Sequence, residues 1–218
     1  VSALRAERSG RLRIAASYTI AEYLLPGWLD RFMRGHEGDS VALDVANSSS
    51  VLARVRDGRA DLGFVETPSN TPGMSEQVVA VDRLVTVVPS RHPWVGKVIP
   101  VEELAATPLV LRELGSGTRQ ALESALGEID LGLVPAVLEL GSTTAVRAAV
   151  LSSNSPTVIS RLAVAAELER EQLVEISIDG LDVARRLRAV WPRGRELPAL
   201  ALDLLEHLRD AGDVGASR

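Results

Sequence analysis

Hydrophobic residues along this chain alternate between the two-residue period of a strand and the three-to-four-residue period of a helix. Short β-rich runs predict strands at 11–16, 41–45, 61–65, 78–88, 109–111, 136–140, 157–159, 173–178 and 186–191. Apolar faces predict helices between them, and the last helix is marked by Leu197, Leu200, Leu204 and Leu208. This order is typical of α/β proteins, in which helices cover both faces of parallel sheets.

Capping residues predict where two of these helices begin. Thr19 is followed three residues later by Glu22, which matches a capping box, so Thr19 is the expected N-cap of the first helix. Pro26 is expected to interrupt that helix or to open its second half. Thr118 is the expected cap of the helix that runs to about Leu126.

Hydroxyl side chains gather at the turns that join predicted strands to the helices after them. They are Ser17 and Thr19; Ser48, Ser49 and Ser50; Ser116 and Thr118; Ser142, Thr143 and Thr144; and Ser160. Ligands bind at the carboxyl ends of parallel strands, where helix starts offer unpaired N–H donors and a partial positive charge. Several such turns around one cleft can hold an anion without a lysine. The alternative is that each hydroxyl is an ordinary N-cap, since Ser and Thr are preferred at that position.

The segment 115–119 (GSGTR) is the most distinctive of these turns. Gly115 and Gly117 allow the backbone to approach a ligand closely. The segment lacks the spacing and the lysine of a P-loop and the third glycine of a dinucleotide fingerprint. Arg119 is expected either to reach an anion or to lie on a solvated helix face. Glu66 follows the predicted strand 61–65 and is a further candidate to line the cleft, with a solvated loop carboxylate as the alternative.

Composition narrows the possible functions. The 218 residues have a formal net charge of −5 and 3% aromatic residues, which disfavours nucleic-acid binding by this chain alone, because such binding uses clustered Lys and Arg and stacking aromatics. The chain has no Cys, and its three His lie far apart, so we expect no metal site and no cofactor. No catalytic motif such as a nucleophile elbow is present, and no apolar run is long enough to span a membrane.

Five segments match one protein family in their order and spacing. They are 10–20 (GRLRIAASYTI), 57–63 (DGRADLG), 91–93 (RHP), 109–119 (LVLRELGSGTR) and 138–149 (LELGSTTAVRAA). Together they resemble the effector-binding domain of LysR-type transcriptional regulators, in the subgroup that includes sulfur-assimilation and carbon-fixation regulators. The resemblance extends over about residues 10–209. The chain departs from the family at 152–156 (SSNSP), where a glycine pair is usual.

The resemblance implies a fold and a set of ligand contacts. The fold is α/β and periplasmic-binding-protein-like (type 2), with two Rossmann-like lobes joined by two crossing strands. The implied lobes are 11–85 with 191–212, and 86–190, and they are flanked by the end of a linker helix at 1–10 and a disordered tail at 213–218. Effector contacts are implied at Ser17, Thr19, Ser49, Ser116, Ser142 and Thr143.

The function implied is that of a cytoplasmic ligand sensor and not of an enzyme. Its ligand would be a small anionic metabolite or oxyanion bound between the lobes. Its other partners would be a second copy of the chain in a homodimer, further copies in a full-length tetramer, and DNA through an N-terminal winged helix-turn-helix absent from this chain. Two alternatives stay open: a solute-binding protein of a transporter, and an enzyme with acid–base residues in the cleft.

Overall fold

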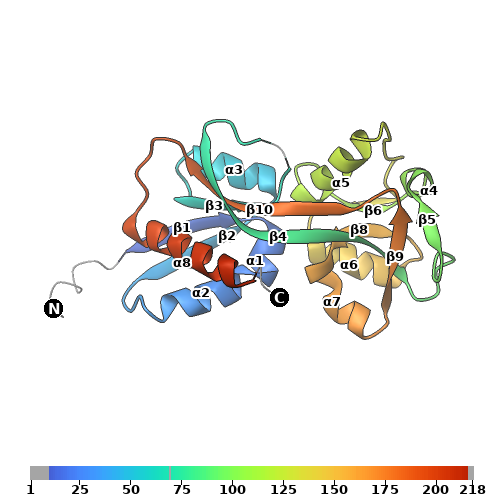
Figure 1. Ribbon diagram of the computed structural model, residues 1–218, viewed down its shortest axis with the longest axis horizontal. Helices are drawn as coiled ribbons and strands as arrows, with labels where there is room; N and C mark the ends of the chain where they lie inside the picture. The colour runs from blue at the N-terminus through green and yellow to red at the C-terminus, as the bar shows by residue number, and fades with distance from the viewer. Residues whose placement is uncertain (1–9, 69, 216–218) are drawn as a thin grey trace. The chain divides into compact units, whose positions relative to one another are not determined.

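The computed structural model describes residues 10–68 and 70–215, and its chain divides into two compact units. One unit comprises the chain up to Ala80 and again from Arg186, and the other comprises Val81–Arg185. Both boundaries fall inside strands, β4 (Met74–Pro89) and β10 (Val183–Pro192) (Figure 1). The chain therefore crosses between the units twice, each time within a strand. The lobe boundaries expected at 85/86 and 190/191 lie slightly further along the same two strands.

The first unit contains one end of an eight-stranded sheet, with the strand order β2-β1-β3-β10. The central strand β1 (Arg11–Ala16) pairs in parallel with β2 (Ser40–Val45) and with β3 (Leu62–Val65). Strand β10 pairs with β3 in the antiparallel direction. The helices of this unit are α1 (Tyr18–Tyr23), α2 (Leu25–Met33), α3 (Ser48–Arg56) and α8 (Ala199–Gly215).

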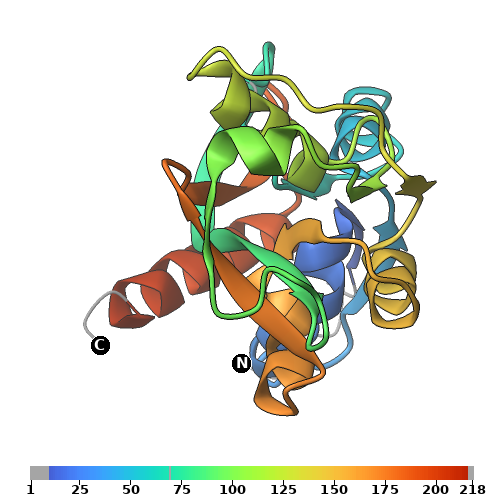
Figure 2. The same cartoon turned by 90° about the vertical axis from the view of Figure 1, so that its right-hand side faces the viewer.

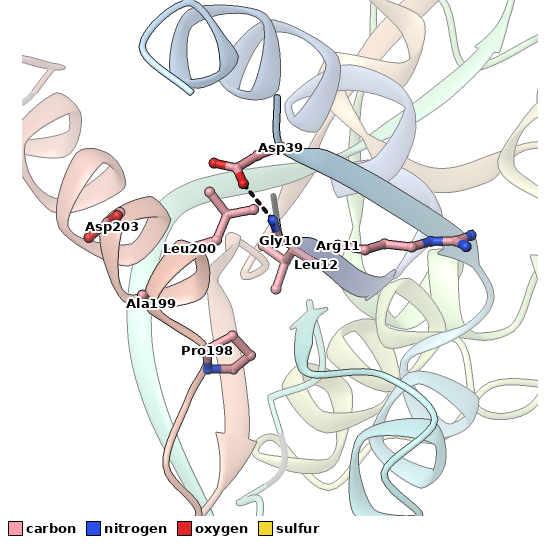
Figure 3. Close-up of a pocket in the computed structure, with 8 residues that line it drawn as sticks. All are labelled: Gly10, Arg11, Leu12, Asp39, Pro198, Ala199, Leu200 and Asp203. Atoms are coloured by element: carbon pink, nitrogen blue, oxygen red, sulfur yellow. Dashed lines mark hydrogen bonds between the residues drawn. The ribbon is translucent and has the colours of Figure 1, made fainter. Parts of the chain in front are cut away.

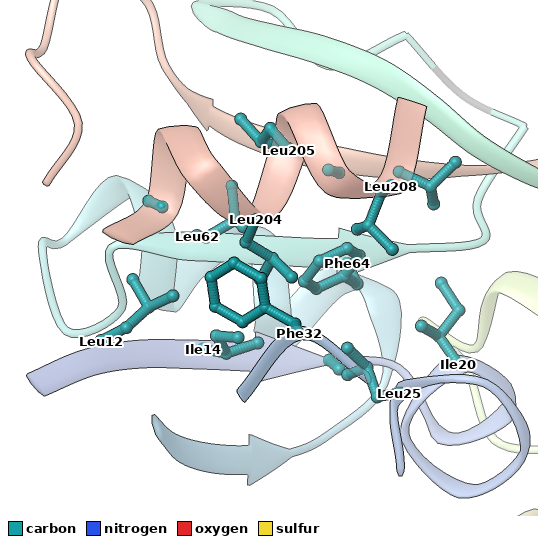
Figure 4. Packing of buried hydrophobic residues seen from close by; sticks show 14 of the residues in the cluster. Leu12, Ile14, Ile20, Leu25, Phe32, Leu62, Phe64, Leu204, Leu205 and Leu208 are labelled. Carbon is teal, nitrogen blue, oxygen red and sulfur yellow. The ribbon is translucent and has the colours of Figure 1, made fainter. Parts of the chain in front are cut away.

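One face of this sheet packs against α2 and α8 (Figure 4). Leu204 and Leu208 are one turn apart on α8 and therefore point to the same side, where they are buried with Phe64 of β3. Phe32 of α2 and Ile14 of β1 belong to the same buried cluster. The leucine spacing in the sequence thus identified the face of α8 that builds the core.

The other face of the sheet packs against α3, and a glycine permits the close approach. A Cβ at Gly63 would lie 2.7 Å from a methyl carbon of Val55 and 2.9 Å from one of Val190. Val51 and Val55 of α3 are fully buried in this second cluster. Only a residue without a side chain leaves room at position 63 for α3 to pack on β3.

The second unit contains the remaining strands of the eight-stranded sheet and a separate two-stranded sheet. Strand β4 pairs antiparallel with β8 (Thr157–Ser160) and with β9 (Leu173–Asp179), and β9 pairs in parallel with β5 (Val98–Pro100). Strands β6 (Val110–Arg112) and β7 (Leu138–Leu140) form a separate parallel pair. The helices, visible around the strands in Figure 2, are α4 (Val101–Ala105), α5 (Gly117–Gly127), α6 (Thr143–Ser152) and α7 (Arg161–Glu169).

Several expectations about individual elements are wrong. The sheets are mixed rather than parallel throughout, because both crossing strands run antiparallel to neighbours. The cap of α1 is Ser17 and not Thr19, and the cap of α5 is Ser116 and not Thr118. Strand β5 and helix α4 were not expected. Helix α8 extends to Gly215, past the start of the expected tail, and residues 1–9 and 216–218 lie outside the described residues.

We predict that Gly63→Ala lowers the stability of the first unit. The new methyl group would overlap Val55 and Val190, and overpacking a filled core costs about 1–3 kcal/mol. Urea unfolding should show a lower midpoint. The matched control is Gly127→Ala at the end of α5, where no atom lies within 4 Å of the new Cβ, and its midpoint should be unchanged or higher. Equal midpoints for the two variants would contradict the packing argument.

Candidate functional site

Strand register brings three of the predicted ligand residues of the first unit to one edge of its sheet. Ala16 of β1 lies beside Phe64 of β3, and the next residue, Ser17, donates its N–H to the Phe64 carbonyl at 2.9 Å. Glu66 follows β3, and its N–H donates to the hydroxyl of Ser48 at 3.3 Å. Ser17, Ser48 and Glu66 thus follow the carboxyl ends of neighbouring strands, as the sequence predicted.

The side chains at this edge differ in how their polar atoms are satisfied. Ser17 is fully buried, and its hydroxyl has no hydrogen-bond partner among the described residues. As N-cap of α1 it does not bond the helix with its side chain. Thr19, the second residue of α1, is also buried. Burying an unsatisfied hydroxyl costs free energy, so the Ser17 oxygen marks a position where a ligand or water is expected.

Helix α3 begins with a run of three serines, which have different environments. Its N-cap is Asn47, whose side-chain oxygen accepts from the Ser50 N–H at 3.0 Å. Ser48 is buried and accepts from Glu66, whereas Ser49 is exposed on the first turn of the helix. A side-chain cap does begin this helix, as the capping alternative expected, but the capping residue is Asn47 and not one of the serines. Of the pair predicted as contacts, Ser48 already has a partner in the protein.

Glu66 is buried, with 2% of its surface exposed. The alternative that it is a solvated loop carboxylate is therefore wrong. It lies between the first turn of α3, through Ser48, and the loop that leads to β4.

In the second unit, strands β6 and β7 end side by side, and their turns meet. Arg112 at the end of β6 donates to the hydroxyl of Thr143 at 2.9 Å. Thr143 is the first residue of α6, and Ser142 before it is the N-cap, accepting from the Ala145 N–H at 3.1 Å. Ser142 and Thr143 therefore have partners within the protein, in agreement with the capping alternative for Ser142.

The turn before α5 has an unsatisfied hydroxyl of the same kind as Ser17. Gly115 has a φ of +88°, which favours glycine, and Gly117 is the first residue of the helix. Between them Ser116 is the N-cap, with 1% of its surface exposed, and its hydroxyl has no hydrogen-bond partner among the described residues. Ser116 thus combines a helix start, a buried free hydroxyl and a glycine turn.

Thr118 and Ser160 belong to a buried polar network rather than to an open turn. Thr118 accepts from Arg185 at 3.0 Å, and Ser160 donates to Asp82 at 2.9 Å. Asp82 and Arg185 form an ion pair in which both side chains are almost fully buried. Sequence analysis missed both charged residues, because they lie 103 positions apart and no local pattern connects them.

Arg119 neither reaches an open anion position nor lies free on a solvated face. Its guanidinium bonds to Glu123 on the same helix, to Glu139 of β7 and to the carbonyl of Arg112. Burial acts to lower the pKa of Arg119, but the hydrogen bonds and charges of Glu123 and Glu139 outweigh it and raise that pKa above its ordinary value. Arg119 therefore stays charged and connects α5 to β7 through these bonds.

A cavity of about 300 Å³ lies elsewhere in the first unit, at the start of β1 and of α8 (Figure 3). Its lining includes Leu12, Pro198 and Leu200, and Asp39 accepts there from the Gly10 N–H at 2.7 Å. This cavity is at the amino end of β1, whereas the hydroxyl turns follow the carboxyl ends. None of the predicted ligand residues lines it.

Two searches of the described part of the chain were negative. No group of three or more His, Asp or Glu residues is placed there to hold a metal ion. Across residues 10–68 and 70–215, no helix is both long and apolar enough for a membrane span.

Comparison with known proteins identifies the family. The model of the LysR substrate binding domain matches residues 5–213. This chain belongs to the LysR substrate-binding domain family. It is 45% identical over 219 residues to the uncharacterized HTH-type transcriptional regulator Rv2282c of Mycobacterium tuberculosis (strain ATCC 25618 / H37Rv), an alignment that covers 95% of this chain and 70% of that protein. The family predicted from the five sequence segments is thereby confirmed.

Two further similarities agree with this assignment. The HTH-type transcriptional activator CmpR of Synechocystis sp. (strain ATCC 27184 / PCC 6803 / Kazusa) is 27% identical over 209 residues, which are 95% of this chain and 68% of CmpR. The regulatory domain of Synechocystis PCC6803 CcmR, solved in complex with 2-PG, is 28% identical with a TM-score of 0.83, covering 93% of this chain and 97% of that one. The chain is thus the ligand-binding domain of a LysR-type regulator, with the type 2 periplasmic-binding-like fold that the sequence predicted.

We predict that alanine at two helix caps has different effects on stability. Ser142→Ala removes a side-chain bond to the Ala145 N–H and should cost about 1 kcal/mol, the usual value of an N-cap. Ser116→Ala removes a buried hydroxyl that bonds nothing in the protein, so the urea midpoint should stay the same or rise. If Ser116→Ala lowers the midpoint as much as Ser142→Ala does, Ser116 is an ordinary cap.

Proposed function

We propose that this ligand-binding domain senses a small anionic metabolite or oxyanion, held at the hydroxyl-rich turns where its helices begin. The main support is that Ser17 and Ser116, one in each unit, are buried at helix starts with hydroxyls that bond no described protein atom. Both follow strands, β1 and β6, that pair in parallel with their neighbours, and ligands of such folds bind at the carboxyl ends of parallel strands.

The ligand class follows from the groups around these hydroxyls. A helix start presents N–H donors and a partial positive charge, which favour an anion. A serine hydroxyl adds a donor that rotates to suit the ligand. The remaining first-unit candidates are the exposed Ser49 and the buried Thr19, Ser48 and Glu66, and the remaining second-unit candidates are Gly115, Gly117, Thr118, Ser142 and Thr143. The 2-PG bound to the similar CcmR domain is a small ligand consistent with this proposal.

The wider role proposed is regulation of transcription without catalysis. The relatives are named transcriptional regulators of the HTH type, and we propose that DNA is bound by a helix-turn-helix outside this domain. We also propose a homodimer through this domain, a tetramer of the whole regulator, and a cytoplasmic place of action beside the DNA. These assignments rest on the family.

We predict that an anion stabilises the chain and that Ser17→Ala and Ser116→Ala weaken its binding. A thermal-shift panel of sulfate, phosphate, 2-PG and small carboxylates identifies the ligand, since one present at 100 times its dissociation constant adds about 2.7 kcal/mol of stability. A hydrogen bond to a charged group contributes about 1.5–3 kcal/mol, so each alanine should reduce affinity roughly 10- to 100-fold.

The control for this experiment is Ser124→Ala, in the middle of α5 and exposed. It should bind as the parent does in titration calorimetry. Parent-like affinity of folded Ser17→Ala and Ser116→Ala would exclude both hydroxyls as contacts. Absence of any stabilising anion would refute the ligand class.

We predict that this chain by itself binds no duplex DNA specifically. Its formal net charge is −5, and phosphate contacts need clustered cations. Low salt strengthens phosphate contacts, so a mobility-shift assay at about 50 mM salt is a stringent test of this prediction. A specific, salt-sensitive complex of the chain with a promoter fragment would show that this domain itself reads DNA.

A further inference from the structure

A buried ion pair in the second unit connects the two strands that cross between the units. Arg185 of β10 donates to one oxygen of Asp82 of β4 from Nε at 2.9 Å and from Nη2 at 2.7 Å. Only 2% and 1% of the two side chains are exposed. Asp82 is the second residue of this unit and Arg185 is its last. The pair therefore lies next to both points at which the chain crosses.

The same pair continues to the starts of two helices. Arg185 Nη1 donates to the hydroxyl of Thr118, which is the second residue of α5, at 3.0 Å. The other oxygen of Asp82 accepts from Ser160, the N-cap of α7, at 2.9 Å. All four side chains are at most 4% exposed. The network thus runs from the first turn of α5, beside Ser116, to the crossing strands and on to α7.

Stability alone does not account for such a network. Removing two charges from water costs several kcal/mol per ion, and apolar replacements of buried ion pairs are often neutral or stabilising. What a bonded network of this kind adds is a fixed geometry, because each group has one arrangement in which its bonds are made. Here the fixed geometry is that of the α5 turn relative to β4 and β10.

A second arginine of β10 makes an equivalent connection in the first unit. Arg188 donates to Glu76 of β4 at 2.7 Å and to the carbonyl of Thr67 at 2.6 Å. Thr67 directly follows Glu66, the buried carboxylate at the predicted ligand edge. Thr71 also donates to Glu76, at 2.9 Å. In each unit, then, an arginine of β10 joins an acidic residue of β4 to a segment that contains predicted ligand residues.

We propose that Asp82 and Arg185 are positioning residues, which link the first turn of α5 to the strands that cross between the units. Arg188 and Glu76 do the same for the segment after β3. A ligand at Ser116 that shifts the α5 turn then acts through Thr118 and Arg185 on β10, and through Asp82 on β4. The inference rests on the proposed function for its ligand, but the mechanical link exists without one and is tested separately.

The first experiment is hydrogen exchange on the ligand-free chain, with Thr118→Val. This variant keeps the side-chain shape and removes the hydroxyl that Arg185 bonds. Exchange should become roughly threefold faster or more at 116–120 and also at 82–85 and 183–186, since a lost connection loosens both of its ends. Thr118→Ser, which keeps the hydroxyl, should restore parent rates.

The matched control is Thr144→Val, at the same second position of α6 and exposed. It should leave exchange in β4 and β10 as in the parent. The proposal is overturned if Thr118→Val changes exchange at the α5 turn alone, or if it changes the strands no more than Thr144→Val does.

The second experiment is a double-mutant cycle with inorganic phosphate as the probe, measured by titration calorimetry. Thr118→Val and Arg185→Lys should each weaken phosphate binding roughly three- to tenfold, and the double variant no more than the worse single one, because both break one connection. Additive losses would make Thr118 an independent contact and overturn the positioning role. If phosphate does not bind the parent, the anion class fails for this probe, while the exchange result still decides the link.

Discussion

Strands β4 and β10 are each shared by both units, and this constraint governs the rest of the structure. In the first unit β10 hydrogen-bonds to β3, and in the second unit β4 hydrogen-bonds to β8 and β9. Both strands belong to one eight-stranded sheet, and a shared strand must satisfy its backbone groups in each unit, so neither crossing can be a loop rich in Gly or Pro. The side chains of a shared strand must also pack in the cores of both units. Buried charges on these strands are therefore paired with opposite charges on the other crossing strand, as in Arg185–Asp82 and Arg188–Glu76.

Much of the fold could be predicted from the sequence, because local periodicity reports which residues face a core. Leu200, Leu204 and Leu208 of the predicted last helix are buried on one face of α8, although Leu197 precedes that helix. Pairing direction could not be predicted, since the same pattern suits parallel and antiparallel neighbours. Strand β5 has only three residues, which are too few to show a hydrophobic period. Helix α4, which follows it, has five residues and is also too short to show one. Both caps were misplaced because a shift of one or two residues in a helix start changes the capping residue.

The candidate site was predictable only in part, for a different reason. Serine and threonine at strand–helix turns could be located from sequence, and the structure has them at the carboxyl ends of the strands. Whether a hydroxyl is already bonded depends on residues distant in sequence, such as Arg112 for Thr143 and Arg185 for Thr118. Sequence alone therefore cannot separate Ser116, whose hydroxyl has no hydrogen-bond partner among the described residues, from Ser142, whose hydroxyl accepts from the Ala145 N–H.

Charge pairing in the second unit bears on how an anion would be selected. Arg112, Arg119 and Arg185 each bind a carboxylate, at 2.7 Å to Glu113, 2.7 Å to Glu123 and 2.7 Å to Asp82. A ligand would have to break one of these pairs to gain an arginine, and that loss offsets the gain. Hydroxyls and helix N–H groups remain as donors, and their directions rather than their charge then decide which oxyanion fits. Since the Ser116 hydroxyl has no hydrogen-bond partner among the described residues, any contribution it made to the affinity for the proposed anion would be separable from its contribution to folding.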